Sequence, residues 1–144
     1  MPQVRDILKV KGSEVVTTGH DETVLAAAAK MNQRRIGALV VMQDDKLVGI
    51  FTERDVMNRV VAASKDAATT RVHEVMTVKV ACCTMETSLE ECRKAMTTHK
   101  IRHLPVMEDE KLAGLLSIGD LLARELAAQQ ETIRFLHEYM QGPN

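Results

Sequence analysis

Residues 36–56 read IGALVVMQDDKLVGIFTERDV, and residues 101–121 read IRHLPVMEDEKLAGLLSIGDL. Each stretch has two short apolar runs joined by an acidic turn. Each then closes with Gly, two apolar residues, a hydroxyl residue, two variable residues and Asp, the last residue but one. An offset of 65 residues aligns 24–62 with 89–127 without a gap, and twelve of these 39 positions are identical. Self-similarity of this length indicates one supersecondary unit that is used twice.

The repeat extends upstream at a different offset. VRDIL at 4–8 is similar to VHEVM at 72–76, 68 residues later, so the first copy has three additional residues, which we assign to a loop near KVKGSE. The small and polar stretch 62–71, AASKDAATTR, is typical of a linker. We therefore expect repeat 1 with its N-terminal lead-in at 1–66, repeat 2 at 67–128, and a helical extension at 129–144.

Each repeat shows the same order of element signals. A β-type run is followed by polar helix caps, a helix of about three turns, two short apolar strands around the acidic turn, and a last helix. The fold class is therefore α+β, β-α-β-β-α used twice, and we expect the two copies to pack face to face around a pseudo-two-fold axis. The expected strands are 14–18, 38–42, 47–51, 78–83, 103–107 and 112–116. The expected helices are 24–35 and 89–100, together with the two segments that begin at 52 and 117. The candidate N-caps are Asp21 or Thr23 for the first helix and Thr87 or Ser88 for its equivalent.

The last helix carries an apolar stripe. Its apolar positions alternate by four and three, which is close to a heptad seam. Two interpretations stay open: the stripe covers the protein's own core, or it forms a subunit interface. Gly142 and Pro143 are expected to end the helix. The stripe consists of Leu122, Leu126, Ile133, Leu136 and Met140, with Gln129 in the gap.

Composition argues against several classes of protein. The net charge is −1, and two Phe, one Tyr and no Trp leave few rings for stacking bases, so we expect no nucleic-acid partner. No apolar run approaches the roughly 20 residues that span a bilayer, and the first residues lack the apolar segment of a signal peptide. We expect a soluble cytoplasmic protein. The three cysteines form no CxxC pair, which favours a core or incidental role over metal or redox work.

The hydroxyl–x–x–Asp motif supports two interpretations. As structure, Thr52 with Asp55 and Ser117 with Asp120 are capping boxes that start a helix after a strand. As chemistry, the same helix start can bind an anion, the hydroxyl can donate to a phosphate, and the carboxylate can accept the hydroxyls of a ribose. The glycine three residues before the hydroxyl allows another backbone to approach closely. Both interpretations use the same residues.

The repeat, its element order and the Gly–apolar–apolar–[Thr/Ser]–x–x–Asp motif resemble the CBS domain, and two copies in tandem resemble a CBS pair, or Bateman module. The resemblance runs from about Val4 into the last helix. It implies a stand-alone regulatory module that binds adenosyl ligands such as AMP, ADP, ATP, NAD(H) or S-adenosylmethionine in clefts between the repeats and signals to a partner in trans. It also implies a homodimer. The alternative is an interaction adaptor without a physiological nucleotide. We expect no enzyme, because the sequence has no nucleophile–base set and no Gly-rich phosphate loop.

The resemblance assigns candidate ligand-binding residues by position. The carboxylates would hold the ribose, the hydroxyls would lie near the phosphates, and the ends of the first strands with the residues before the second strands would contact adenine. These candidates are Thr17, Thr18, Ile36, Ala38, Thr52, Arg54 and Asp55 in the first copy, and Cys82, Cys83, Ile101, Arg102, His103, Ser117 and Asp120 in the second.

The two copies differ in where they place positive charge. The first has Arg54 inside its motif, where the second has Gly119, whereas the second has Arg102 and His103 before its second strand. Our hypothesis is that these two basic clusters converge on phosphates near the pseudo-axis, each lending charge to the cleft of the other copy, and the alternative is that Arg54 and Arg102 are ordinary surface charges. His99 and His103 need not share a helix face, and we expect no metal site.

Overall fold

The structure is a computed structural model that describes residues 1–141, and the side chains of residues 1–137. The predicted helix end at Gly142 and Pro143 lies outside the described residues. The order β-α-β-β-α occurs twice, as predicted. The first repeat consists of β1 (Thr17–Gly19), α2 (Val24–Arg34), β2 (Ala38–Gln43), β3 (Lys46–Thr52) and α3 (Glu53–Asp55), which continues as the π-helix η1 (Val56–Val61). The second consists of β4 (Cys83–Thr84), α5 (Leu89–His99), β5 (His103–Glu108), β6 (Lys111–Ser117) and α6 (Ile118–Gln141).

Each repeat forms a three-stranded sheet of the same topology. The first strand pairs in parallel with the second, and the second pairs antiparallel with the third, giving the orders β1-β2-β3 and β4-β5-β6. The acidic turns join the antiparallel strands, and their central residues have positive φ, at 50° and 64° for Asp44 and Asp45. Asp tolerates this left-handed region, which tight hairpin turns require.

The N-caps of the two longer helices before the second strands lie at residues that the sequence predicted. Of the predicted candidates, Thr23 and Ser88 are the N-caps of α2 and α5, and their side chains accept the amides of Ala26 and Glu91 at 3.1 Å. Both helices end in a residue with positive φ, and both predicted helix ranges extend one residue too far.

Two expectations for the first part of each repeat are wrong. The runs 14–18 and 78–83 contribute only two- or three-residue strands, because the residues before each strand connect it to a lead-in helix that packs in the core of the other repeat. Thr77, just before the second run, pairs with Ile50 of the first repeat. The lead-ins are helices, α1 (Val4–Lys11) and α4 (Val72–Val75), and α1 includes the first part of the expected loop, so that the loop begins only at Gly12.

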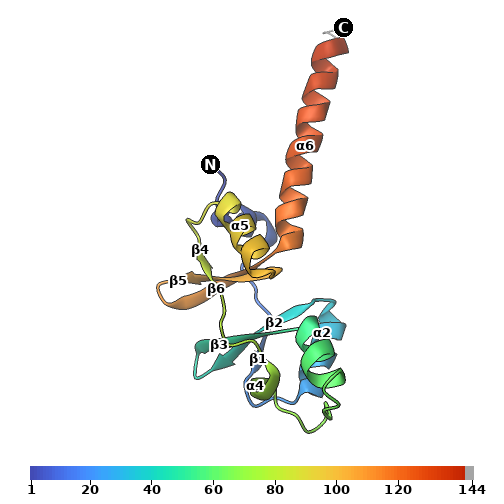
Figure 1. The fold of residues 1–144 in the computed structure, drawn as a ribbon. Coiled ribbons are helices and arrows are strands. Elements are labelled where there is room, and N and C mark those ends of the chain that lie inside the picture. The colour runs from blue at the N-terminus through green and yellow to red at the C-terminus, as the bar shows by residue number, and fades with distance from the viewer. Residues whose placement is uncertain (142–144) are drawn as a thin grey trace.

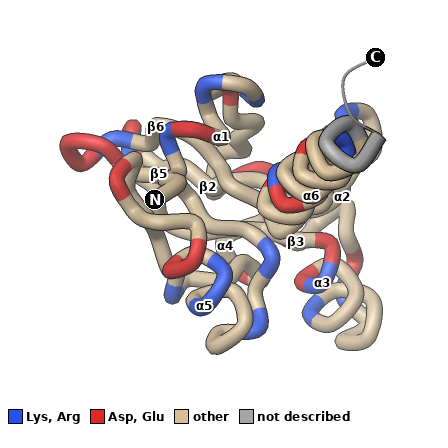
Figure 2. The backbone as a smooth tube through the Cα atoms, turned by 90° about the horizontal axis from the view of Figure 1, so that it is seen from above, with Lys and Arg blue, Asp and Glu red and all other residues tan. Residues whose placement is uncertain are grey.

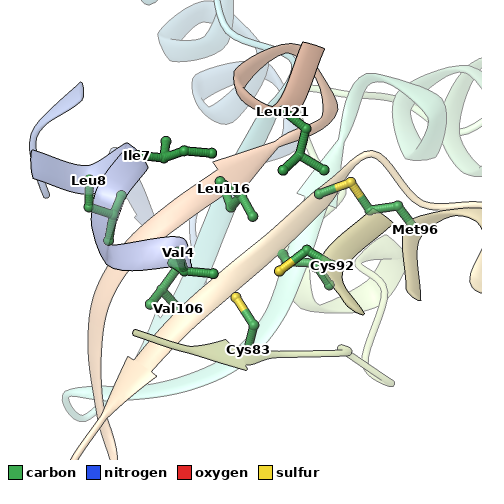
Figure 3. Close-up of a cluster of buried hydrophobic side chains, with 10 residues drawn as sticks. Val4, Ile7, Leu8, Cys83, Cys92, Met96, Val106, Leu116 and Leu121 are labelled. Carbon is green, nitrogen blue, oxygen red and sulfur yellow. The ribbon is translucent and has the colours of Figure 1, made fainter. Parts of the chain in front are cut away.

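The two lead-in helices are exchanged between the repeats. Val4, Ile7 and Leu8 of α1 are buried among second-repeat residues such as Leu104 and Leu116 (Figure 3). Backbone bonds from Val4 to Thr87 and from Leu89 to Pro2, at 3.0 and 3.1 Å, fix this position. In return, Val72 and Val75 of α4 pack into the core of the first repeat, which contains Leu39, Val41 and Phe51. Each core is therefore built by both halves of the chain.

The two sheets face one another, with the helices of each repeat on the outer side (Figure 1). Side chains alternate across a strand, so Val40 and Ile50 point away from the core that holds Leu39 and Phe51. Val40 and Ile50 are nevertheless buried, since they lie at the interface between the repeats. The expected face-to-face arrangement is confirmed.

The cysteines are free thiols. Cys83 and Cys92 are buried in the second core with their sulfur atoms directed toward one another, and Cys82 is exposed (Figure 3). The adjacent Cys92 thiol and burial both raise the pKa of Cys83 well above its ordinary value. A core role is therefore confirmed for Cys83 and Cys92.

Helix α6 extends away from the body (Figure 1). Leu121 is buried in the second core, but Leu122, Leu126, Ile133 and Leu136 are each more than half exposed. The stripe thus does not cover the chain's own core, and the interpretation as a subunit interface stays a prediction. Among the described residues, α6 and the other helices are too short or too polar to cross a membrane.

Candidate functional site

A cavity of about 510 Å³ lies between the two repeats. Its volume is within the range of roughly 300 to 1,000 Å³ that is usual for small-molecule sites. The first repeat contributes the start of α3 and η1, and the second contributes the end of α5, the start of β5 and the segment after α4. The lining residues are Gly37, Ile50, Thr52, Glu53, Arg54, Asp55, Met57, Asn58, Arg59, Thr77, Lys79, Val80, Ala81, His99, Lys100, Ile101, Arg102 and His103.

Both predicted capping boxes form. The Asp55 amide donates to Thr52 Oγ1 at 3.2 Å, and the Thr52 amide donates to Asp55 Oδ2 at 3.0 Å. The Asp120 amide donates to Ser117 Oγ at 3.1 Å, and the Ser117 amide donates to Asp120 Oδ2 at 2.8 Å. The motif therefore acts as structure in both repeats, and this fixes the direction of each carboxylate.

Asp55 has two further partners. The Thr77 hydroxyl lies 3.2 Å from Asp55 Oδ1 and 3.4 Å from Oδ2, and Arg59 Nε lies 3.7 Å from Oδ1. Arg59 is held in turn by the Met76 carbonyl, to which it donates at 2.9 Å. The carboxylate therefore lies at the cavity wall, in contact with one neutral hydroxyl and one looser guanidinium.

Gly49 explains how Thr77 reaches this carboxylate. The backbones of Thr77 and Ile50 exchange two hydrogen bonds of 2.9 Å directly beside Gly49. A Cβ atom on Gly49 would lie 2.8 Å from the Thr77 carbonyl oxygen and 2.7 Å from Met76 Sδ. The close approach of another backbone, expected from the motif glycine, is confirmed here, because no side chain fits between the two segments.

The cavity has an excess of positive charge. Five Lys and Arg residues line it, against Glu53 and Asp55 only. His99 and His103 add two imidazoles, and burial together with the nearby Lys11 lowers the pKa of His103. Basic and acidic positions are otherwise interspersed along the backbone (Figure 2). The five cations are Arg54, Arg59, Lys79, Lys100 and Arg102.

The cavity brings together six of the fourteen predicted site residues, from both repeats: Thr52, Arg54, Asp55, Ile101, Arg102 and His103. Its lining combines the motif of the first repeat with the strand entry of the second, whereas we had grouped Ile101 with the second motif. The other eight lie outside it: Thr17, Thr18, Ile36, Ala38, Cys82, Cys83, Ser117 and Asp120. Among them, Thr18 Oγ1 is buried without a hydrogen-bond partner among the described residues.

Asp120 is bound by a residue that we did not predict. Lys11 Nζ, at the end of α1, donates to Asp120 Oδ2 and to the Leu115 carbonyl, both at 2.7 Å. Burial raises the pKa of Asp120, but the hydrogen bonds from Lys11 and Ser117 outweigh it and hold the pKa below its ordinary value. The carboxylate of the second motif therefore forms an ion pair with a lysine of the same chain.

Sequence reasoning also missed Thr77, Arg59, Lys79 and Lys100 at the cavity. One signal was present: the 68-residue offset of the lead-ins, continued past 72–76, pairs Lys11 with Lys79. Lys11 contacts the motif carboxylate of the other repeat, and Lys79 lines the cavity that the other motif carboxylate, Asp55, also lines.

Comparison with known proteins gives consistent results. The family model for the CBS domain matches residues 4–62 and 72–126. The mitochondrial CBS domain-containing protein CBSX3 of Arabidopsis thaliana is 33% identical over 150 residues, which cover 96% of this chain and 72% of the relative. A solved structure from Burkholderia ambifaria, a CBS-domain protein to which a role in signal transduction is ascribed, is 41% identical with a TM-score of 0.85, covering 88% of this chain and 96% of that one. The hexameric CBS-CP12 protein of bloom-forming cyanobacteria is 26% identical with a TM-score of 0.73, covering 93% and 86%.

Proposed function

The chain belongs to the CBS-domain family, with two such domains in tandem, and we propose that it is a regulatory module that binds a phosphorylated adenine nucleotide in the cavity between its repeats. Nucleotide binding would be read by a protein partner in trans, and the module itself would catalyse no reaction. The observation that carries the proposal is the combination, in one cavity, of a fixed carboxylate with five cationic side chains.

The cavity offers a complementary group for each part of a nucleotide. The Asp55 carboxylate can accept hydrogen bonds from ribose hydroxyls. The guanidinium groups of Arg54 and Arg102 suit phosphate oxygens, which they can bind in a bidentate manner. Apolar side chains, among them Ile101 and Met57, provide surfaces for a base. This distribution favours ADP or ATP over S-adenosylmethionine, which is a cation in its sulfonium part, and over AMP and NAD(H), which carry less phosphate charge than ATP.

A thermal-shift series tests the proposal. The wild-type chain is heated with AMP, ADP, ATP, NAD, NADH or S-adenosylmethionine, each at millimolar concentration. A ligand that binds only the folded state with micromolar affinity adds about 4 kcal/mol of stability at a thousandfold excess over Kd, which raises Tm by several degrees. We expect the largest shift with ATP or ADP. No shift with any of the six would favour the alternative, an interaction adaptor without a physiological nucleotide.

The exposed stripe of α6 supports a second part of the proposal, self-association as a homodimer. The side chains of four leucine and isoleucine residues at heptad seam positions are exposed in the single chain: Leu122, Leu126, Ile133 and Leu136. Gln129 takes a seam position between them, and a polar residue there sets the register with an identical helix. The CBS-CP12 relative is hexameric, and light scattering measures how many copies of this chain assemble. For the compartment, we propose the cytoplasm, although the Arabidopsis relative is mitochondrial.

A further inference from the structure

Two equivalent lysines have different surroundings. Lys11 is the last residue of α1, and its ammonium group donates to Asp120 and to the Leu115 carbonyl at 2.7 Å. Lys79, its counterpart in the second lead-in, lines the cavity and forms no ion pair with a carboxylate in the described part of the chain. The carboxylate of the second motif is therefore paired with a lysine, whereas that of the first motif is not.

The difference begins in the backbone of the lead-ins. Helix α4 ends at Val75, Met76 is extended with ψ at 162°, and Thr77 then pairs with Ile50. The β-branched residues Thr77 and Val78 favour this extended course. Helix α1 instead continues to Lys11, and Gly12 ends it with a φ of 94° and a 2.8 Å bond to the Leu8 carbonyl. As a result, a hydroxyl reaches Asp55, and an ammonium group reaches Asp120.

Solvent exposure alone would favour Asp120, and not Asp55, as the carboxylate that a ligand reaches. The side chain of Asp55 is 7% exposed and that of Asp120 is 21% exposed, so Asp120 is the more accessible of the two. The distinction lies in the charge around each carboxylate and in its place in the fold. The Lys11 ammonium donates to Asp120 Oδ2 at 2.7 Å and so neutralises that carboxylate through a charge-assisted hydrogen bond. At Asp55 the paired cation, Arg59, is 3.7 Å away and is bound to the Met76 carbonyl, and a ribose hydroxyl can replace the neutral Thr77 hydroxyl like for like. Asp55 also lines the cavity between the repeats, whereas Asp120 does not.

We infer that the two copies of the motif have separate tasks: the Asp55 copy binds the nucleotide, and the Asp120 copy fastens α1 to the second repeat through Lys11, so that each chain takes up one nucleotide. The inference rests on the proposed function for its first half. The second half rests on the contacts of α1, whose apolar residues Val4, Ile7 and Leu8 are already buried in the second core. The ion pair holds the far end of the same helix.

Calorimetric titration with ATP and thermal unfolding test both halves. We expect one ATP per wild-type chain, at least tenfold weaker binding in Asp55→Asn, and less than a twofold change in Lys11→Met and Asp120→Asn. In unfolding, Lys11→Met is expected to lower Tm in the wild-type background but to have little further effect in the Asp120→Asn background, because the two residues act as a pair.

Several results would overturn the inference. Two ATP per wild-type chain, or a loss of affinity in Asp120→Asn equal to that in Asp55→Asn, would contradict the single-site assignment while leaving nucleotide binding intact. Additive Tm changes in the double variant would contradict the fastening role. A wild-type chain that binds no nucleotide would refute the proposed function and the single-site assignment with it, whereas the Tm measurements would still decide the role of Lys11.

Discussion

Replacing Gly49 by Ala perturbs the contact on which the candidate site depends. The new Cβ would lie 2.8 Å from the Thr77 carbonyl oxygen, a backbone atom that cannot turn aside, and 2.7 Å from Met76 Sδ. Relief of such overpacking costs about 1–3 kcal/mol. Disturbing the two Thr77–Ile50 backbone bonds adds about 1 kcal/mol for each bond that is lost. We expect a net destabilisation of about 3 kcal/mol.

Urea unfolding followed by circular dichroism measures this effect. With an m-value of about 2 kcal/mol/M, the midpoint of Gly49→Ala should fall by about 1.5 M. Gly119→Ala is the matched control, because its Cβ would meet only Ser117 Oγ, at an ordinary 3.5 Å, and neither glycine has a positive φ. In the first turn of α6, Ala should be neutral or slightly stabilising. A Gly49→Ala midpoint equal to that of the wild type would refute the packing argument.

Three further predictions concern the cavity and α6. Arg54→Ala should weaken ATP binding about tenfold and AMP binding less, since a charge-assisted phosphate contact is lost, as measured by calorimetry. Burial lowers the pKa of His103, so the imidazole is protonated in the unfolded chain before it is protonated in the folded chain. The free energy of unfolding should therefore fall as the pH drops through about 6.5. His103→Gln should remove the contribution of this imidazole to the fall between pH 7.5 and 5.5, as measured by urea titrations. The double variant Leu126→Glu, Ile133→Glu should convert the proposed homodimer into a monomer in light scattering.

Each of these predictions has a clear contrary result. Unchanged affinity and unchanged selectivity for phosphate number in Arg54→Ala would make this residue an ordinary surface charge. Identical pH profiles for His103→Gln and the wild type would show that His103 is not the group that titrates. A wild-type chain that is monomeric, or a dimer that persists after both Glu substitutions, would remove α6 from the interface.

Local features of the fold were predictable because they are encoded within a few residues. Thr52 and Asp55 are three positions apart, and their capping box follows from the strand–helix junction alone. The left-handed hairpin turns at Asp44 and Asp109 follow similarly from the acidic pairs between apolar runs. The repeat made the topology predictable, because the same order of strand and helix signals in both copies indicates one supersecondary unit that is used twice.

The exchange of the lead-ins was not predictable in the same way. VRDIL and VHEVM carry the same apolar pattern, so either one fits either core, and no local signal says which core each fills. The contacts that depend on the exchange were therefore missed, including Thr77 at Asp55 and Lys11 at Asp120, which are 22 and 109 residues apart in sequence. Ile101 lines the cavity together with the motif of the first repeat, and the ligand contact that we predicted for it stays a prediction.

The central claim is that Asp55 binds a nucleotide in the cavity between the repeats. Its most direct test is the Kd for ATP of the wild type and of Asp55→Asn, measured by calorimetry. Asn keeps the size of the side chain and an acceptor for the Thr52 amide, so the cap is preserved while the charge and one of the two acceptor oxygens are lost. Losing hydrogen bonds to a charged group, each worth about 1.5–3 kcal/mol, should raise Kd at least tenfold. Equal affinities for the two chains, or no binding of ATP by the wild type, would contradict the account.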